Sequence, residues 1–370
     1  LVTGTMIAPL PLKRAEPADN PDLCEVFADT PMEGDIWLNQ DRRPDFFHGT
    51  AVQSEKPEVF VLRKEEEPGL DAVFAVGRRR VFVNGQPQTI RYLSDLRIVS
   101  GHRGGSKLAR GFQFLRNEVL KNGEFAQTLV LSENEKALDL LTSRRCGLPG
   151  YFPCGEYDYF LIGLRHSPCP SPRLHVRRGT PRDIPLIQDF FNREAPRKQF
   201  FPVYRFDELG RSAYYRNAKL ENFFLAWAGD ELVGLLGAWD QGDYKKILVR
   251  GYGGGLRWLR PWLNAFSRLR GGIELPAPGA LQRTLYLHCA VCRDNDPDIL
   301  ASLIRDAQSG FAEQGYHHAA LGLDRHDPLR EALAGFRTMN FAGRHFLVSF
   351  GDDPRPTLDN QVFYFEAARI

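Results

Sequence analysis

The stretch LSDLRIVSGHRGGSKLARGFQFLRNEV, residues 93–119, decides the expected fold because it joins a strand, a short basic turn and an amphipathic helix. Strand-forming residues run over 89–99, and glycines punctuate the turn at 101–105. Apolar residues then recur at helical spacing, at Leu108, Phe112, Leu115 and Val119. This order of elements is typical of a site for a phosphorylated cofactor.

The turn has the electrostatic properties of an anion site. The first backbone N–H groups of a helix have no partner within the helix, and the helix dipole favours negative charge there. Arg103 and Lys107 add positive charge beside these groups. A plain strand-to-helix connection is the alternative interpretation, because glycine-rich turns are common in such places. A second copy of the same order of elements, described below, argues for the cofactor site.

The turn also resembles a known motif. Leu96-Arg97-Ile98 followed by residues 103–108 resembles motif A of the GCN5-related N-acetyltransferases (GNAT), which bind acyl-coenzyme A there. The resemblance implies cofactor contacts from Ile98, Val99, Arg103, Gly104, Gly105, Ser106 and Lys107. Ser106 and Leu108 stand where the family has small residues. Either the loop is set one residue differently, or it binds pyrophosphate more weakly than usual.

The likeness continues downstream. Residues 127–131 predict a buried strand, and residues 132–138 open a helix similar to the Asn-x-x-Ala element of the family. By this resemblance, Asn134 would contact the pantetheine arm. Two further strands are expected near 151–157 and 159–164.

The chain then repeats the same order of elements. Strands are expected at 174–179, 223–229, 231–239, 284–291, 318–323, 345–350 and 362–366, with helices after 180–183, over 300–311 and before Leu333. We therefore expect an α/β fold with two fused acyl-CoA N-acyltransferase (GNAT) domains, each a mixed, mostly antiparallel sheet flanked by helices. The expected boundaries are 1–166, a linker at 167–173 that is rich in proline, and 174–370.

The two copies differ where the phosphates would bind. In the second copy the turn reads VCRDNDPD over residues 291–298. Aspartates at a helix start cap the helix, but each would repel a nearby phosphate by about 1–4 kcal/mol close to a surface. We expect acetyl-CoA or another acyl-CoA to bind to the first domain alone, and the second domain to complete the acceptor site.

Composition sets the remaining limits. The chain has 370 residues, 43% of them hydrophobic, and a formal charge of +2. No run approaches 18 apolar residues, and six cysteines are scattered, so we expect a soluble, cytoplasmic protein. Cys289 and Cys292 form a C-x-x-C, but strand alternation directs them to opposite faces and no second pair exists, so no metal is expected.

A basic aromatic segment spans residues 245–270 inside an expected insertion at 245–272. It carries seven lysines and arginines and no acidic residue. The ordinary interpretation is an amphipathic helix packed on its own domain, with a solvated basic rim. The functional alternatives are a membrane-surface helix, a nucleic-acid patch, or a cover for the acceptor cleft with affinity for an acidic or acylated substrate. We favour the cleft cover among these three.

Acyl transfer to an amine requires a base, because an alkylammonium must lose a proton before it attacks. Asp95 is the first candidate, and Tyr92 and His102 are the others. The resemblance implies an oxyanion donor among the backbone N–H groups that close the strand, at Ile98 or Val99. Where the family carries a tyrosine acid this chain has Leu140-Leu141, which leaves Tyr151 and Tyr157 as substitutes.

These observations predict an N-acyltransferase that moves an acyl group from acyl-CoA to a primary amine of a small molecule or peptide. Two alternatives stay open. One is a non-catalytic regulatory protein that binds coenzyme A or another ligand with the same fold, and the other is an aminoacyl-tRNA-dependent transferase. Among partners, a nucleic acid is not expected, and a membrane surface bound through 245–270 stays open.

Overall fold

The computed structural model describes residues 12–32, 34–64, 67–99, 111–121, 123–143, 147–164, 174–270 and 273–370. The expected phosphate turn at 101–105 and the expected linker at 167–173 lie outside these ranges.

Strands and helices alternate along the first half of the chain. Its strands are β1 (Leu12–Arg14), β2 (Ile36–Asp41), β3 (Glu55–Arg63), β4 (Leu70–Val83), β5 (Gln86–Ile98), β6 (Ala126–Leu131) and β7 (Gly150–Gly163). Its helices include α1 (Asn20–Asp29), α2 (Phe46–Gln53) and α4 (Glu135–Thr142), and a π-helical turn covers Leu115–Val119.

The second half repeats this alternation. Its strands are β8 (His175–Arg178), β9 (Phe223–Ala228), β10 (Glu231–Asp240), β11 (Lys246–Tyr252), β12 (Leu281–Gln282), β13 (Thr284–Cys292), β14 (His318–Asp324) and β15 (Thr338–Ser349). Its helices include α5 (Ile184–Glu194), α6 (Leu256–Arg270) and α7 (Pro297–Phe311). The expected helix before Leu333 is a 3-10 helix, Pro328–Gly335.

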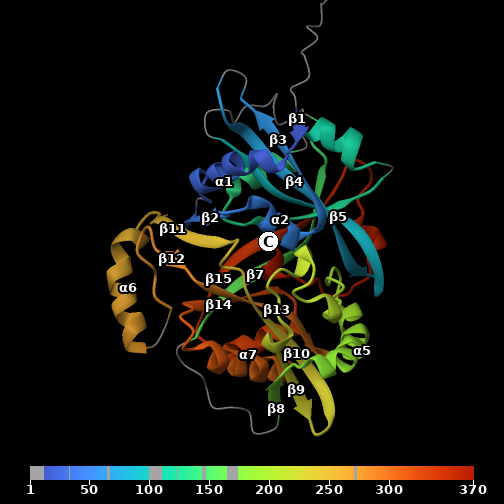
Figure 1. The fold of residues 1–370 in the computed structure, drawn as a ribbon, viewed down its shortest axis with the longest axis vertical. Helices are drawn as coiled ribbons and strands as arrows, with labels where there is room; N and C mark the ends of the chain where they lie inside the picture. The colour runs from blue at the N-terminus through green and yellow to red at the C-terminus, as the bar shows by residue number, and fades with distance from the viewer. Residues whose placement is uncertain are drawn as a thin grey trace, which may run out of the picture.

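Within the described residues, twelve strands form one continuous sheet in the order β1-β3-β4-β5-β6-β15-β7-β14-β13-β10-β9-β8 (Figure 1). Read inward from the two edges, the strands of each half follow in chain order. They are β1, β3, β4, β5 and β6 in the first half, and β8, β9, β10, β13 and β14 in the second. The described pairs are antiparallel except β5 with β6 and β13 with β14, which are parallel. The expected mixed α/β fold is therefore confirmed.

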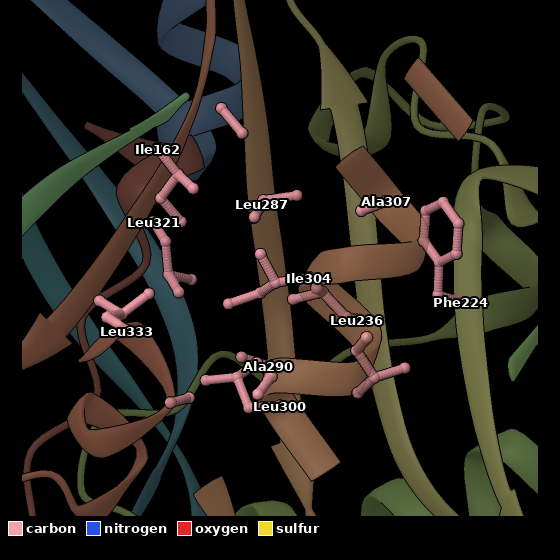
Figure 2. Packing of buried hydrophobic residues seen from close by; sticks show 14 of the residues in the cluster. Ile162, Phe224, Leu236, Leu287, Ala290, Leu300, Ile304, Ala307, Leu321 and Leu333 are labelled. Atoms are coloured by element: carbon pink, nitrogen blue, oxygen red, sulfur yellow. The ribbon is translucent and has the colours of Figure 1, made fainter. Parts of the chain in front are cut away.

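The two halves exchange their last strands at the centre of the sheet. β15, from the end of the chain, pairs with β6 and β7 of the first half. β7 in turn pairs with β14 of the second half. Figure 2 shows Ile162 of β7 in the core formed with α7, among second-half residues such as Leu287 and Leu321. The two sequence halves therefore share one sheet and one set of core contacts at their junction.

A second, three-stranded sheet also joins the halves. β11 of the second half pairs antiparallel with β2 of the first half and with β12. In Figure 1 this small sheet lies to one side of the central strands, with α6 beyond it at the edge of the molecule.

Three of the expected strands differ from the structure. The strands expected at 151–157 and 159–164 are one continuous strand, β7. Asp158, the polar residue between the two expected strands, is buried and binds Arg330 and Asn340. The chain therefore continues through it as a strand, without a turn. The strand expected at 362–366 is wrong, because this segment makes only an isolated bridge from Phe363 to Gln199.

Candidate active site

The site lies where two parallel strands diverge. β5 and β6 pair through Arg91 and Tyr92 only, opposite Ala126 and Gln127. Just beyond, the Thr128 hydroxyl donates to the Leu93 carbonyl at 2.9 Å. Within the described residues, β5 makes no ladder pairing with β6 beyond Tyr92, which leaves an opening between the two strands.

The opening belongs to a cavity of about 420 Å³ between the large and the small sheet. This volume lies in the usual range for small-molecule sites, about 300–1,000 Å³. Its lining is mostly apolar, and it comes from the ends of β5 and β6, from both long strands of the small sheet, and from residues 273–276. Both halves of the chain therefore build it.

A β-bulge shapes the wall of the cavity on β5. The register with β4 shifts between Val73 opposite Arg97 and Ala75 opposite Ser94, so Asp95 and Leu96 fall in the bulge. Asp95 has a φ of +58°, in the left-handed region. A bulge takes a residue out of the ladder and redirects its side chain. Asp95 and its neighbours from Leu93 to Ile98 line the cavity.

The two predicted backbone donors at the end of β5 differ in direction. The Val99 N–H donates to the Asp71 carbonyl at 2.9 Å, so this group already belongs to the sheet. Ile98 lies opposite Ala72, in the next and therefore non-hydrogen-bonded pair of the antiparallel ladder. Its N–H consequently points away from β4, toward the side where β6 has diverged.

The Asp95 carboxylate is held by a buried arginine. The guanidinium of Arg42, the residue after β2, donates to both Asp95 oxygens at 2.7 and 2.8 Å. The two side chains are only 1% and 5% exposed. Arg42 also lies 4.9 Å from the ring centre of Phe27 and 5.1 Å from that of Phe46. This bidentate pair fixes the carboxylate at the cavity wall.

Lys245 lines the cavity, whereas the sequence pattern predicted that it belongs to a solvated basic segment. Its ammonium group donates to the main-chain oxygen of Ile370 and lies 4.6 Å from the ring centre of Tyr286. Burial, with a smaller contribution from the Arg42 charge, lowers the pKa of Lys245 to about 7. Nothing in the sequence separates it from Lys246, because the burial arises from β13 and from the end of the chain.

The predicted tyrosines all reach the cavity. Tyr92 is buried, and the Arg79 guanidinium lies 3.2 Å from its ring centre. Burial raises the pKa of Tyr92, Tyr151 and Tyr157. All three phenols therefore keep their protons at neutral pH.

Asn134 also lies at the cavity, as the N-cap of α4. Its side-chain oxygen accepts a hydrogen bond from the Ala137 N–H at 3.3 Å. The other predicted cofactor residues, Arg103, Gly104, Gly105, Ser106 and Lys107, lie outside the described residues together with His102. Downstream of them, Phe112 and Leu115 pack in the core beside the opening.

The second half repeats the divergence but fills it. β13 and β14 pair in parallel from Thr284 to Tyr286, and then separate. A bulge follows at Cys289, three residues after Tyr286, just as Asp95 follows Tyr92, and Cys289 has a φ of +51°. The Cys289 N–H donates to Glu366 Oε2 at 3.0 Å.

A second side chain of the same segment closes this opening further. The Ala290 N–H donates to the Tyr364 hydroxyl at 3.3 Å, and that hydroxyl donates to Glu366 at 3.0 Å. The ring of Phe365 lies against Gly322 of β14. Residues 364–366 therefore occupy the space between β13 and β14, and we call them the plug.

The acidic turn of the second half serves the local structure. Asp296 caps α7 by accepting from the Asp298 N–H at 2.8 Å. Asp294 binds Arg197 at 2.7 Å, and Arg293 binds Glu231 at 2.8 Å. The expected capping role is thus confirmed for Asp296, and the arginine of the turn is already paired.

The C-x-x-C pair lies apart from the cavity. Cys289 and Cys292 pack into two different hydrophobic clusters, on opposite faces of β13, as alternation predicts. Burial raises the pKa of both thiols. Among the residues that the structure describes, no group of three or more metal-binding side chains comes together.

The comparisons by sequence give no match, either with protein-family models or with curated proteins. Solved structures do match. Saccharomyces cerevisiae N-myristoyltransferase with bound myristoyl-CoA aligns at a TM-score of 0.61 and 11% identity, over 98% of this chain and 91% of that one. A GCN5-related N-acetyltransferase from Sphaerobacter thermophilus aligns at 0.55 and 14% identity, over 97% and 100%.

A third similar structure is a GCN5-related glucosamine N-acetyltransferase region of a fungal multi-domain β-N-acetylglucosaminidase. It aligns at a TM-score of 0.58 and 12% identity, over 94% of this chain and 39% of that one. At these identities the likeness concerns the fold. These alignments cover nearly all of this chain and show that it shares the fold of GCN5-related N-acetyltransferases and of N-myristoyltransferase.

Proposed function

We propose that this protein is an acyl-CoA-dependent N-acyltransferase with a single cofactor site, at the opening between β5 and β6. The observation that carries the proposal is the contrast between the two openings. The first is continuous with the cavity, whereas the plug fills the second. The similar structures support the choice of reaction, since they include acetyltransferases and an N-myristoyltransferase with its acyl-CoA.

The plug also indicates where the thioester oxygen would bind. In the second half a carboxylate oxygen accepts a hydrogen bond from the bulge N–H of Cys289. The equivalent N–H in the first half is that of Asp95, a residue that lines the cavity. A preorganised backbone donor at this position would stabilise the negative oxygen that forms when an amine attacks the thioester. The Ile98 N–H is a second donor for the bound cofactor.

Lys245 is the base that the geometry favours. With its pKa lowered to about 7, much of it is neutral at slightly alkaline pH, and a neutral amine has a lone pair. It would take the proton of the acceptor ammonium. The free amine then attacks the thioester carbon, a C–N bond forms and the C–S bond breaks. The proton that the amine nitrogen loses as the amide forms goes to the thiolate, and Lys245 releases its own proton to solvent.

Asp95 and the tyrosines take other roles in this proposal. Both Asp95 oxygens bind Arg42, so its carboxylate is a positioning group for the cavity wall. Tyr151 is a poor proton source for the thiolate, because burial raises its pKa. We assign it a hydrogen-bonding role. The apolar lining favours an acyl chain longer than acetyl or an acceptor with an apolar part.

Turnover tests the proposal. Purified protein is mixed with acyl-CoA of increasing chain length and a panel of primary amines, and free thiol is measured. We expect release of coenzyme A that depends on the amine and rises with pH through about 7. Lys245→Met should lower kcat by about 10²–10⁴, while Lys246→Met, the matched control, should not. Tight binding of acyl-CoA without release for any amine would favour the non-catalytic alternative.

A further inference from the structure

Helix α6 turns polar side chains toward the protein and large apolar side chains toward solvent, the reverse of a helix that packs on its own domain. It lies at the edge of the molecule beside the small sheet (Figure 1). A surface helix ordinarily turns its apolar stripe toward the core and its polar face toward water. The exposure and the hydrogen bonds of α6 show the opposite arrangement.

Polar side chains hold α6 to the protein. Asn264 is only 7% exposed; its amide donates to the Leu275 carbonyl at 2.8 Å and accepts from the Leu275 N–H at 2.7 Å. Arg260 donates to the same carbonyl at 3.0 Å. Leu275 itself is buried against Val249 and Tyr252. The orientation of the helix is thus fixed by satisfied, buried hydrogen bonds.

The large apolar side chains point outward instead. Trp258 is 76% exposed, Trp262 78% and Leu269 86%. At 100° per residue these three positions share one face of the helix, and Leu259, Leu263 and Phe266 extend it. All six are exposed. An apolar face of this size on one helix marks an interaction surface, because single exposed apolar residues are ordinary and contiguous patches are not.

The charges around this face indicate the partner. Residues 245–270 contain no Asp or Glu, and the exposed Arg257 and Arg268 lie along the helix. Arg268 forms an ion pair with Glu274 at 2.9 Å, while the guanidinium of Arg257 lies beside the ring of Trp258. Tryptophan and leucine on one face with arginine beside it are typical of helices that lie in the plane of a membrane interface.

We propose that α6 docks this protein on a bilayer that contains anionic phospholipids, with Trp258, Trp262 and Leu269 inserted at the level of the head groups. A helix of 15 residues is roughly 22 Å long, which is shorter than the roughly 30 Å hydrocarbon core. No helix in the described part of the chain is long and apolar enough to cross a membrane. The helix therefore lies on the surface of the bilayer.

This orientation has a consequence for the cavity. Residues 273–276, which follow α6, line the cavity, and Leu275 is the residue that Asn264 and Arg260 hold. A docked α6 brings this wall of the cavity close to the lipid head groups. An amphiphilic acyl donor or acceptor would then have a short path between bilayer and cavity. The docking itself does not depend on the proposed acyl transfer.

Sedimentation with vesicles tests the docking. The full chain is mixed with vesicles of phosphatidylcholine alone, or of phosphatidylcholine and phosphatidylserine at 3:1. We expect binding to the anionic vesicles at least about tenfold tighter than to the neutral ones, and weaker in high salt. The double variant Trp258→Ala/Trp262→Ala should lose about tenfold or more of this binding. Leu186→Ala on α5, another exposed apolar residue, is the matched control and should bind like the wild type.

The variants should melt at the wild-type temperature, because the substituted side chains are exposed. Absence of wild-type binding to anionic vesicles, or equal binding by the double variant, would overturn the proposal. A concentration-dependent dimer that forms without vesicles and is lost in the double variant would overturn it in favour of a second copy of the chain as the partner.

Discussion

The openings between β5 and β6 and between β13 and β14 share their backbone geometry and differ in their contents. Each follows a short parallel pair, and each has a bulge residue with positive φ three positions after a tyrosine, at Asp95 and at Cys289. The first opening leads to the cavity, whereas Glu366 and Tyr364 fill the second. Diverging strands expose backbone N–H groups that need an acceptor, and in the second opening side chains of this protein supply it.

The difference teaches that diverging strands need not leave a void, because side chains of the same chain can fill the space between them. In the second half, side chains of this protein supply the oxygens that a bound molecule would supply in the first. The acidic turn before α7 agrees with this division, since Asp294 and Asp296 already serve an ion pair and a helix cap. Removing or altering the groups on either side should therefore have unequal effects.

The largest effect is expected from the plug. Glu366 is buried and accepts from the Cys289 N–H and from the hydroxyls of Tyr204 and Tyr364. Glu366→Ala leaves these donors without an acceptor, so the free energy of unfolding should fall by about 3–5 kcal/mol. Urea denaturation measures it. Glu366→Gln keeps an oxygen of similar shape and should cost less; equal losses would show that hydrogen bonding is not what holds the plug.

Lys245 should make stability depend on pH. The pKa of Lys245 is about 7 in the folded protein, and its ordinary value, which applies to the unfolded chain, is 10.5. Between pH 7 and pH 10.5 the unfolded chain therefore binds a proton that the folded protein does not. Stability should therefore rise with pH across this window, by up to about 1.4 kcal/mol per pH unit. Below pH 7 both states are protonated and the slope vanishes.

Thermal or urea unfolding at pH 7, 8 and 9 checks this slope. Lys245→Met should flatten it, and Lys246→Met should leave it as in the wild type. A wild-type slope that survives in Lys245→Met would mean that another group titrates.

The phosphate turn should show the contrast between the halves in binding. Arg103→Ala should weaken coenzyme A binding about tenfold or more, since a charge-assisted hydrogen bond contributes roughly 1.5–3 kcal/mol. Arg293→Ala should have little effect, because Arg293 pairs with Glu231. Calorimetric titration of both variants compares them, and equal losses would contradict the assignment of the turn.

The smallest effect is expected from Tyr364→Phe. The change removes one hydroxyl that bridges the Ala290 N–H and Glu366, and it keeps the ring that stacks on Phe201. The free energy of unfolding should fall by about 1 kcal/mol. A loss as large as that of Glu366→Ala would indicate that the two side chains act as one unit.

Local patterns in the sequence sufficed for most of the elements that were expected after residue 88. The strand expected at 89–99 is β5, the strand at 127–131 is β6, and the helix after Asn134 begins at its cap. Propensity and period decide these elements, and both are visible in a short window. The tyrosines predicted for the site, and Asp95, all reach the cavity for the same reason, because they lie on correctly placed strands.

Long-range partners decided the rest. In the sequence Asp158 has the character of a turn residue. In the structure it lies inside β7, where Arg330, 172 positions later, binds it. Residues 362–366 have the composition of a strand, yet their side chains, rather than their backbone, bond to β13. Lys245 and Lys246 are neighbours of equal type, and only the tertiary fold buries one of them in the cavity. The outward face of α6 likewise depends on Leu275, which holds its polar side.

The stoichiometry of coenzyme A binding tests the central claim most directly. Calorimetric titration of the full chain with coenzyme A should give one site per chain, since one opening leads to the cavity and the plug fills the other. Two equivalent sites per chain, or none, would contradict the account.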